Sequence, residues 1–184
     1  AAEDAGLPSV LVLNKCDLAD LRPGALARLE PFRGLGYPLV EIAARRDAEP
    51  LRAYLAGQRT LLAGQSGMGK STLVGALVPL AEVRIQEISR YLDAGRQTTT
   101  TARLYSLDAT SELVDSPGVS EFGLAGFPVQ SLAAGFREIE QHANQCRFRD
   151  CRHLVEPGCA IEAAAGRGAI HPRRLVLYRQ IARA

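Results

Sequence analysis

The sequence has 184 residues, 47% of them hydrophobic, which is enough apolar material for a buried core and for one or two domains. Its net charge of +2 does not by itself indicate a nucleic-acid partner. No run approaches the about 20 apolar residues that span a bilayer, and the first residues carry no signal segment. A cytoplasmic protein without a membrane contact is therefore expected.

The first half of the chain alternates predicted strands with predicted helices. Branched apolar runs predict buried strands over residues 9 to 13, 37 to 42 and 60 to 63, and helical spacing predicts helices over 20 to 34, 48 to 56 and 70 to 77. This alternation predicts an α/β, doubly wound fold with a mostly parallel sheet.

The second half changes character. Paired strands are predicted over residues 104 to 107 and 112 to 114, on either side of a turn. Beyond Pro128 the pattern becomes helical, breaks at a cluster of Cys and His, and resumes as a helix over 173 to 184. We expect two domains, residues 1–130 and residues 131–184, the second small and helical.

A glycine loop lies between the third predicted strand and the following helix. It matches the phosphate-binding pattern G-x-x-x-x-G-K-[ST] in full, in the context that the pattern requires. Backbone N–H groups at a helix N-terminus favour phosphate, Lys70 would neutralise it, and Ser71 would bind Mg²⁺. The plain alternative is a glycine-rich turn without a ligand. The expected nucleotide-binding residues are Gly64, Gln65, Ser66, Gly67, Met68, Gly69, Lys70, Ser71 and Thr72.

Two later segments fit the same chemistry. Asp115 ends a predicted strand and begins D-x-x-G, so its carboxylate would reach the metal through water while the Gly118 N–H meets the γ-phosphate. The glycine-led threonine run over 95 to 101 is suited to a switch segment with Thr99 as a magnesium ligand. An edge strand of threonines is the alternative interpretation of that run.

A base-recognition pattern, N-K-x-D, follows the first predicted strand as Asn14, Lys15, Cys16 and Asp17. The aspartate can accept hydrogen bonds from guanine N1 and N2, whereas adenine has an acceptor at N1. The alternative is a strand-to-helix turn with Asp17 as helix N-cap. In ordinary small GTPases this loop follows the phosphate loop, so the order of motifs here is circularly permuted. Sheet geometry permits this, because every loop stays at the same sheet edge.

The C-terminal cluster comprises Cys146, Cys151, His153 and Cys159. Three thiolates and one imidazole form a complete tetrahedral set for a structural Zn²⁺, without an open position for water. Free cysteines beside an incidental histidine are the alternative. The tail from residue 146 onward is basic, with eight arginines against three acidic residues.

These motifs, in this order, resemble the ribosome small-subunit-dependent GTPase A family (RsgA/YjeQ) over essentially the whole chain. The quoted segments are Gly-Gln-Ser-Gly-Met-Gly-Lys-Ser-Thr, Asp-Ser-Pro-Gly-Val-Ser-Glu-Phe-Gly-Leu and the Cys/His spacing. The resemblance implies a circularly permuted P-loop GTPase with a C-terminal zinc-binding domain. It also implies a GTPase that binds the small ribosomal subunit and its rRNA and hydrolyses GTP to GDP during late assembly, stimulated by the subunit. One structural Zn²⁺, Mg²⁺ with GTP, and a monomer are expected.

Three departures from the family pattern qualify the expected site. Val119 follows D-x-x-G where Ras-type GTPases have a water-orienting glutamine, a hydrophobic replacement that the family shares, whereas Gln97 stands where the family has a histidine in its switch. Gln97 is therefore the candidate for orienting water, beside Lys70 and Asp115 as catalytic residues. Ala43 and Ala44 replace a serine-alanine-like pair at guanine O6, where a backbone N–H would serve with weakened affinity.

The third departure concerns the front of the chain. The family begins with an OB-fold and a strand that precedes the base-recognition strand, and the sequence contains neither. We expect a fragment of a longer protein, with a break in the sheet between the strands at 9 to 13 and 60 to 63. The competing functions are a permuted GTPase unrelated to ribosomes, and an RNA-binding adaptor that holds nucleotide without hydrolysing it.

Overall fold

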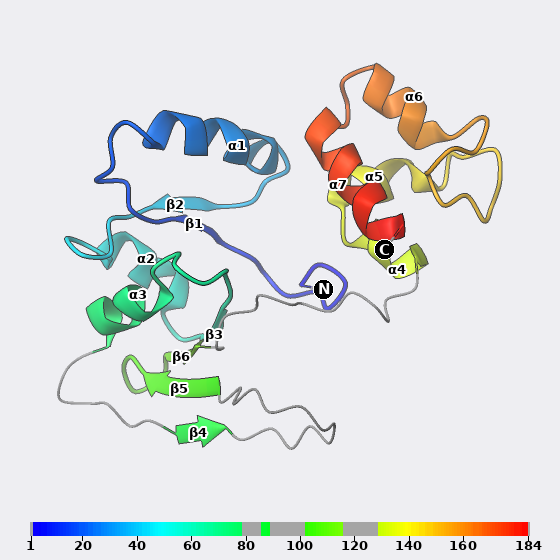
Figure 1. Cartoon of the computed structure of the whole chain (residues 1–184). Helices are drawn as coiled ribbons and strands as arrows, with labels where there is room; N and C mark the ends of the chain where they lie inside the picture. Colours follow the sequence, from blue (N-terminus) through cyan, green and yellow to red (C-terminus); the bar gives the residue numbers. More distant parts are fainter. Residues whose placement is uncertain (1, 79–85, 89–101, 116–128, 184) are drawn as a thin grey trace. The chain divides into compact units, whose positions relative to one another are not determined.

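The structure, a computed structural model, describes residues 2–78, 86–88, 102–115 and 129–183 (Figure 1). Its contacts divide the chain into two compact units. The sheet unit comprises Leu11–Leu26 and Leu39–Phe122, and the helical unit comprises Ala1–Val10, Ala27–Pro38 and Gly123–Ala184. Because both units combine separate stretches of the chain, the two domains expected from sequence, 1–130 and 131–184, stay a prediction.

The sheet unit holds two sheets in the described part of the chain. Strand β1 (Leu11–Leu13) pairs in parallel with β2 (Leu39–Glu41). The second sheet has the order β3-β6-β5-β4, with β3 (Arg59–Leu62), β6 (Glu112–Asp115), β5 (Ala102–Ser106) and β4 (Gln86–Ile88). Strands β3 and β6 are parallel, and the β6-β5 and β5-β4 pairs are antiparallel. The fold is α/β, as predicted.

Strands β1 and β3 belong to different sheets among the described residues. The sequence led us to expect a break between these two segments, and the break is present. One consequence is visible on β3, where Leu61 leaves 59% of its surface exposed. A leucine in the middle of a covered parallel sheet would be buried on both faces.

Two helices of the sheet unit bury their apolar residues. Helix α2 (Glu49–Leu55) buries Leu51 and Leu55, and α3 (Lys70–Leu77) buries Leu73, Val74 and Leu77. Helix α3 ends because Val78 precedes Pro79, and a residue before proline favours the extended backbone that Val78 adopts.

The β5-β6 hairpin is closed by a side chain. The carboxylate of Asp108 accepts hydrogen bonds from the backbone N–H of Thr110 (2.8 Å) and Ser111 (2.9 Å). These hydrogen bonds lower the pKa of Asp108, since they favour its charged form. The turn predicted between the two strands is confirmed.

The helical unit contains short helices around one core. They are α4 (Val129–Ala134), α5 (Arg137–Ala143), α6 (Ala160–Gly166) and α7 (Pro172–Arg183). Ile139, Ile161, Ile170 and Tyr178 are fully buried, and the Phe136 ring meets that of Tyr178 edge-on with centroids 5.4 Å apart. None of the described helices, in either unit, is long and apolar enough to cross a bilayer.

The C-terminal part of helix α1 (Arg22–Gly34) belongs to the helical unit, where an arginine of helix α7 contacts it. The Arg174 guanidinium lies over the rings of Phe32 (4.6 Å) and Phe136 (4.5 Å) and donates to the buried carboxylate of Glu138 at 2.5 and 3.2 Å. Burial of this charge is compensated by a paired, bidentate partner.

Candidate functional site

A cavity of about 640 Å³ opens in the sheet unit where four segments meet. These segments follow β1, β2 and β3 and include the end of β6, so they gather at the carboxyl ends of strands, where α/β proteins bind ligands. The cavity is lined by Asn14, Lys15, Asp17, Leu18, Ala44, Arg45, Ser66, Gly67, Gly69, Lys70, Ser71, Thr72 and Asp115.

Asn14 connects three of these segments. Its Nδ2 donates to the carbonyl of Met68 at 3.1 Å, and its Oδ1 accepts the backbone N–H of Ala44 at 3.0 Å. The neighbouring Lys15 has a left-handed backbone, with φ at 65°, and its Nζ donates to the carbonyl of Gly67 at 2.8 Å. The N-K-x-D loop is thereby fastened to the glycine loop.

Gly69 makes this approach possible. Its φ of +93° lies in the left-handed region, and a Cβ placed there would lie 2.6 Å from Asn14 Nδ2. Two constraints therefore favour glycine at position 69: the left-handed backbone and the lack of space for a Cβ. Helix α3 begins at the next residue, so its first N–H groups face the loop.

Lys70 folds back onto the glycine loop. Its Nζ donates to the carbonyls of Gly64 (2.5 Å) and Gln65 (3.1 Å). Lys70, Ser71 and Thr72 line the cavity from the first turn of α3. A cationic side chain and a helix N-terminus on the same wall favour an anion such as phosphate.

Asp115 ends β6 on the wall of the same cavity. Its Oδ1 is buried and has no hydrogen-bond partner among the described residues. Burial raises the pKa of this carboxyl, while the charges of Lys70 and Arg103 act in the opposite direction. A buried carboxylate oxygen without a partner, in a cavity that Ser71 also lines, fits a hydrated Mg²⁺.

Several predicted site residues lie elsewhere. Cys16, Gly64, Gln65 and Met68 do not line the cavity, and the Cys16 thiol instead donates to the carbonyl of Leu13 at 3.3 Å. Gln97, Thr99, Gly118 and Val119 lie outside the described residues. Leu18 and Arg45 line the cavity but were not predicted as binding residues; their signal was only their place near the end of a buried strand. Ala44, expected near guanine O6 through a backbone N–H, also lines the cavity.

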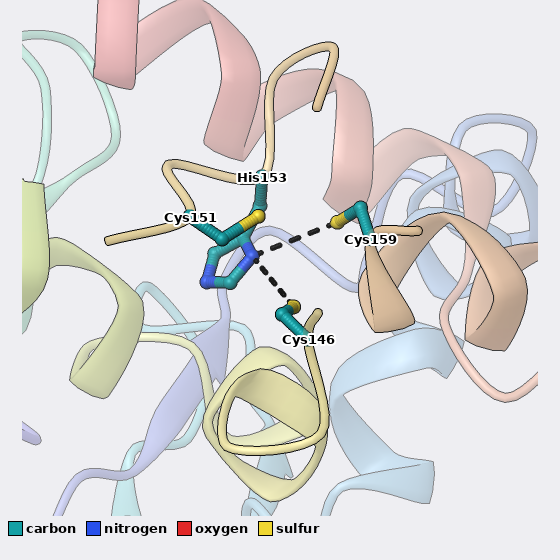
Figure 2. Close-up of side chains that lie close together, drawn as sticks. All are labelled: Cys146, Cys151, His153 and Cys159. Carbon is teal, nitrogen blue, oxygen red and sulfur yellow. Dashed lines mark hydrogen bonds between the residues drawn. The ribbon is translucent and has the colours of Figure 1, made fainter. Parts of the chain in front are cut away.

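The Cys/His cluster is assembled in the helical unit, as Figure 2 shows. The donor atoms of Cys146, Cys151, His153 and Cys159 all lie within 4.8 Å of one another. His153 Nδ1 lies 3.5 Å from Cys146 Sγ and 3.6 Å from Cys159 Sγ. Bonds of about 2.0 to 2.3 Å to a tetrahedral zinc place ligand atoms about 3.5 to 3.8 Å apart. The cluster therefore fits a closed, structural Zn²⁺ site.

The surroundings of the cluster also suit a metal. Burial lowers the pKa of His153, against the opposing charge of Glu156, and this favours the neutral imidazole that can act as a ligand. Burial raises the pKa of the Cys151 thiol to about 12. Since zinc binds thiolate, the cation must supply the free energy that removes this proton.

The loop between the ligands is shaped by a residue that is not a ligand. The Glu156 carboxylate accepts the backbone N–H groups of Arg152 (3.0 Å), Leu154 (2.9 Å) and Val155 (3.0 Å). His153 lies inside this turn with φ at 61°, an uncommon value for a residue other than glycine. Glu156 thereby stabilises the backbone that presents the imidazole.

A family model and the most similar curated proteins indicate the same family for this chain. Residues 1–125 match the model of the family described as RsgA GTPase. The chain is 48% identical to a protein of Nitrosomonas europaea and 46% identical to one of Nitrosospira multiformis, each named small ribosomal subunit biogenesis GTPase RsgA. Both alignments cover 98% of this chain, which spans 59% and 58% of the lengths of those relatives.

Solved structures agree with this relationship. YjeQ from Thermotoga maritima superposes with a TM-score of 0.77 at 33% identity, covering 98% of this chain and 61% of that one. YloQ, described as a circularly permuted GTPase, superposes with a TM-score of 0.71 at 26% identity, covering 94% of this chain and 55% of that one. The permuted order of motifs, the cavity that they line and the family match over residues 1–125 have one explanation: this chain belongs to the RsgA GTPase family.

Proposed function

We propose that this chain binds GTP and hydrolyses it to GDP and phosphate during assembly of the small ribosomal subunit. The observation that carries the proposal is the double hydrogen bond of Asn14, to Met68 and to Ala44. It holds a guanine-type recognition loop against a phosphate-type glycine loop within one cavity. A strand-to-helix cap, the alternative interpretation of N-K-x-D, does not require this tie.

At the base end, Asp17 accepts hydrogen bonds from guanine N1 and N2, and Asn14 keeps its loop in place. At the phosphate end, Lys70 exchanges its bonds to Gly64 and Gln65 for phosphate oxygens. Gly118 N–H meets the γ-phosphate. Ser71 and Thr99 would hold Mg²⁺, with Asp115 acting through water, and the cation would neutralise the phosphate charge.

Orientation of the attacking water is assigned to Gln97. Its amide can accept a hydrogen bond from water and donate another to phosphate, as glutamine does in other GTPases. The Gln97→Ala chain should bind GTP normally and hydrolyse it slowly. An unchanged rate of hydrolysis with the subunit present would remove Gln97 from the mechanism.

The helical unit is the proposed contact with ribosomal RNA. Seven of its exposed arginines form no ion pair within the described part of the chain: Arg28, Arg147, Arg149, Arg152, Arg167, Arg173 and Arg183. Such side chains bind a phosphate backbone by charge, so binding should weaken as salt rises. One Zn²⁺ keeps this surface folded. We further propose that the chain acts as a monomer in the cytoplasm.

Base recognition is tested by changing Asp17 to asparagine. The amide of Asn donates a hydrogen bond that guanine N2 cannot accept but xanthine O2 can. The Asp17→Asn chain should therefore lose affinity for GDP and gain affinity for xanthosine diphosphate. If both nucleotides bind the two chains equally, Asp17 does not contact the base and the proposal fails.

The adaptor function is a second candidate because Val119 occupies the usual position of the water-orienting glutamine and Gln97 replaces the histidine of the family's switch segment. An adaptor would bind GTP tightly and show no turnover, with or without small ribosomal subunits. Single-turnover hydrolysis separates the two functions.

A further inference from the structure

The turn after β2 brings an arginine to the cavity wall beside the base-recognition loop. Arg45 lines the cavity together with Asn14, Asp17 and Ala44. Its neighbour Ala44 is fixed by the 3.0 Å hydrogen bond to Asn14, so the backbone before Arg45 is anchored at the base end. The position of Arg45 therefore follows from the same contact that positions the base loop.

Three other hydrogen-bond donors at this end have protein partners. The Lys15 ammonium donates to Gly67, the Ala44 N–H donates to Asn14, and one N–H of the Asn14 amide donates to Met68. Lys70 is at the phosphate end. Among the cationic side chains that line the cavity, Arg45 is the one without a protein partner in the described part of the chain.

Guanine offers acceptors that Asp17 cannot satisfy. An aspartate recognises the N1 and N2 donors, whereas O6 and N7 form a pair of adjacent acceptors on another edge of the base. The sequence led us to expect a backbone N–H of the Ala43-Ala44 pair at O6, but the Ala44 N–H is used by Asn14. The next residue, Arg45, offers a backbone N–H and a guanidinium on the same turn.

We propose that Arg45 is a specificity-determining residue that donates to O6 and N7 of guanine. Two parallel N–H groups of a guanidinium match this acceptor pair. Adenine carries an amino group in place of O6, so its edge repels the same fork. The inference rests on the proposed function. Arg45 would recognise the O6 and N7 acceptors of guanine, whereas Asp17 recognises its N1 and N2 donors.

The experiment compares nucleotide affinities of the full 184-residue chain and its variants. The nucleotides are GDP and deaza-GDP, in which a C–H replaces N7. Arg45→Ala should weaken GDP binding about tenfold and deaza-GDP binding about twofold, since the N7 contact is already missing. Arg45→Lys, which keeps the charge without the fork, should lose most of the same affinity for GDP.

Arg46→Ala is the matched control, because Arg46 is also exposed but does not line the cavity, and it should bind both nucleotides as the unaltered chain does. Equal losses of GDP and deaza-GDP affinity in Arg45→Ala, or no loss of either, would overturn the inference while the proposed function stands. Failure of the unaltered chain to bind GDP would overturn both.

Discussion

The backbone N–H of Ala44 donates to the side-chain oxygen of Asn14 across 3.0 Å, joining residues that are 30 positions apart in the chain. Asn14 belongs to the N-K-x-D loop, and Ala44 belongs to the turn that follows β2. Since the other end of the Asn14 amide holds Met68, one side chain sets the spacing of three cavity walls. The nucleotide pocket therefore depends on this residue for its shape as well as for any contact with the base.

Replacing Asn14 with alanine should lower both affinity and stability. The change leaves the Ala44 N–H and the Met68 carbonyl without their partner, at a cost of about 1 to 3 kcal/mol in the free energy of unfolding. GDP affinity should fall at least about tenfold, because the loops are no longer tied. Asn144→Ala, in the other unit, is the control and should leave GDP affinity unchanged. An unchanged GDP affinity in Asn14→Ala would show that the hydrogen bonds of Asn14 do not hold the nucleotide-binding loops in place.

Adding one methyl group at Gly69 should abolish nucleotide binding. A Cβ at this position would lie 2.6 Å from Asn14 Nδ2, and the φ of +93° is unfavourable for alanine. Gly75→Ala is the matched control in the same helix, where a Cβ meets nothing within 4 Å. That control should bind GDP normally and gain up to about 1 kcal/mol of stability. Calorimetric titration with GDP distinguishes the two variants.

Removal of zinc should unfold the helical unit. The unit is small, and its loop between Cys146 and Cys159 has little apolar material of its own. Metal analysis should find one zinc per chain, and Cys151→Ser should lose it together with helical circular dichroism. Cys16→Ser is the control, since Cys16 lies outside the cluster, and should keep its zinc. Full metal content in Cys151→Ser would exclude the proposed ligand set.

Replacing Glu156 with glutamine should change how stability depends on pH. Partial burial works against the carboxylate, but the hydrogen bonds from backbone N–H groups outweigh it and lower the pKa of Glu156 from 4.5 to about 2. A lowered carboxyl pKa stabilises the folded state above the ordinary value, and this contribution is lost as pH falls toward the folded value.

The free energies of unfolding of the two chains should therefore differ by about 1 kcal/mol at neutral pH, with Glu156→Gln the less stable. This difference should shrink as the pH falls from 4.5 toward 2. Denaturant titrations of both chains at several pH values provide the comparison, in which protonation of the metal ligands is common to both. A difference that does not vary with pH would exclude the charged carboxylate as its source.

The parts of the site that could be predicted from the sequence are formed by residues that lie close together in the chain. The glycine loop and N-K-x-D each require a fixed local order, so both could be recognised before their contact through Asn14 was known. The Cys/His cluster was recognisable for the same reason, because its ligands span only 14 positions.

The parts that were missed depend on tertiary structure or lack a periodic pattern. Arg45 reaches the cavity because the turn after β2 is held to Asn14, which no local pattern expresses. Helix α6 is seven residues long and rich in alanine, and β4 has three residues, so neither shows a period. The helix expected beyond Pro128 is divided into α4 and α5, since Phe136 adopts an extended backbone between them.

The most direct test of the account is GTP hydrolysis by this chain, alone and with purified small ribosomal subunits, at low and moderate salt. We expect slow hydrolysis by the chain alone and faster hydrolysis with subunits, with the stimulation weakened by salt because the arginines of the helical unit bind by charge. Tight binding of GTP without turnover under any of these conditions would contradict a GTPase and favour the adaptor.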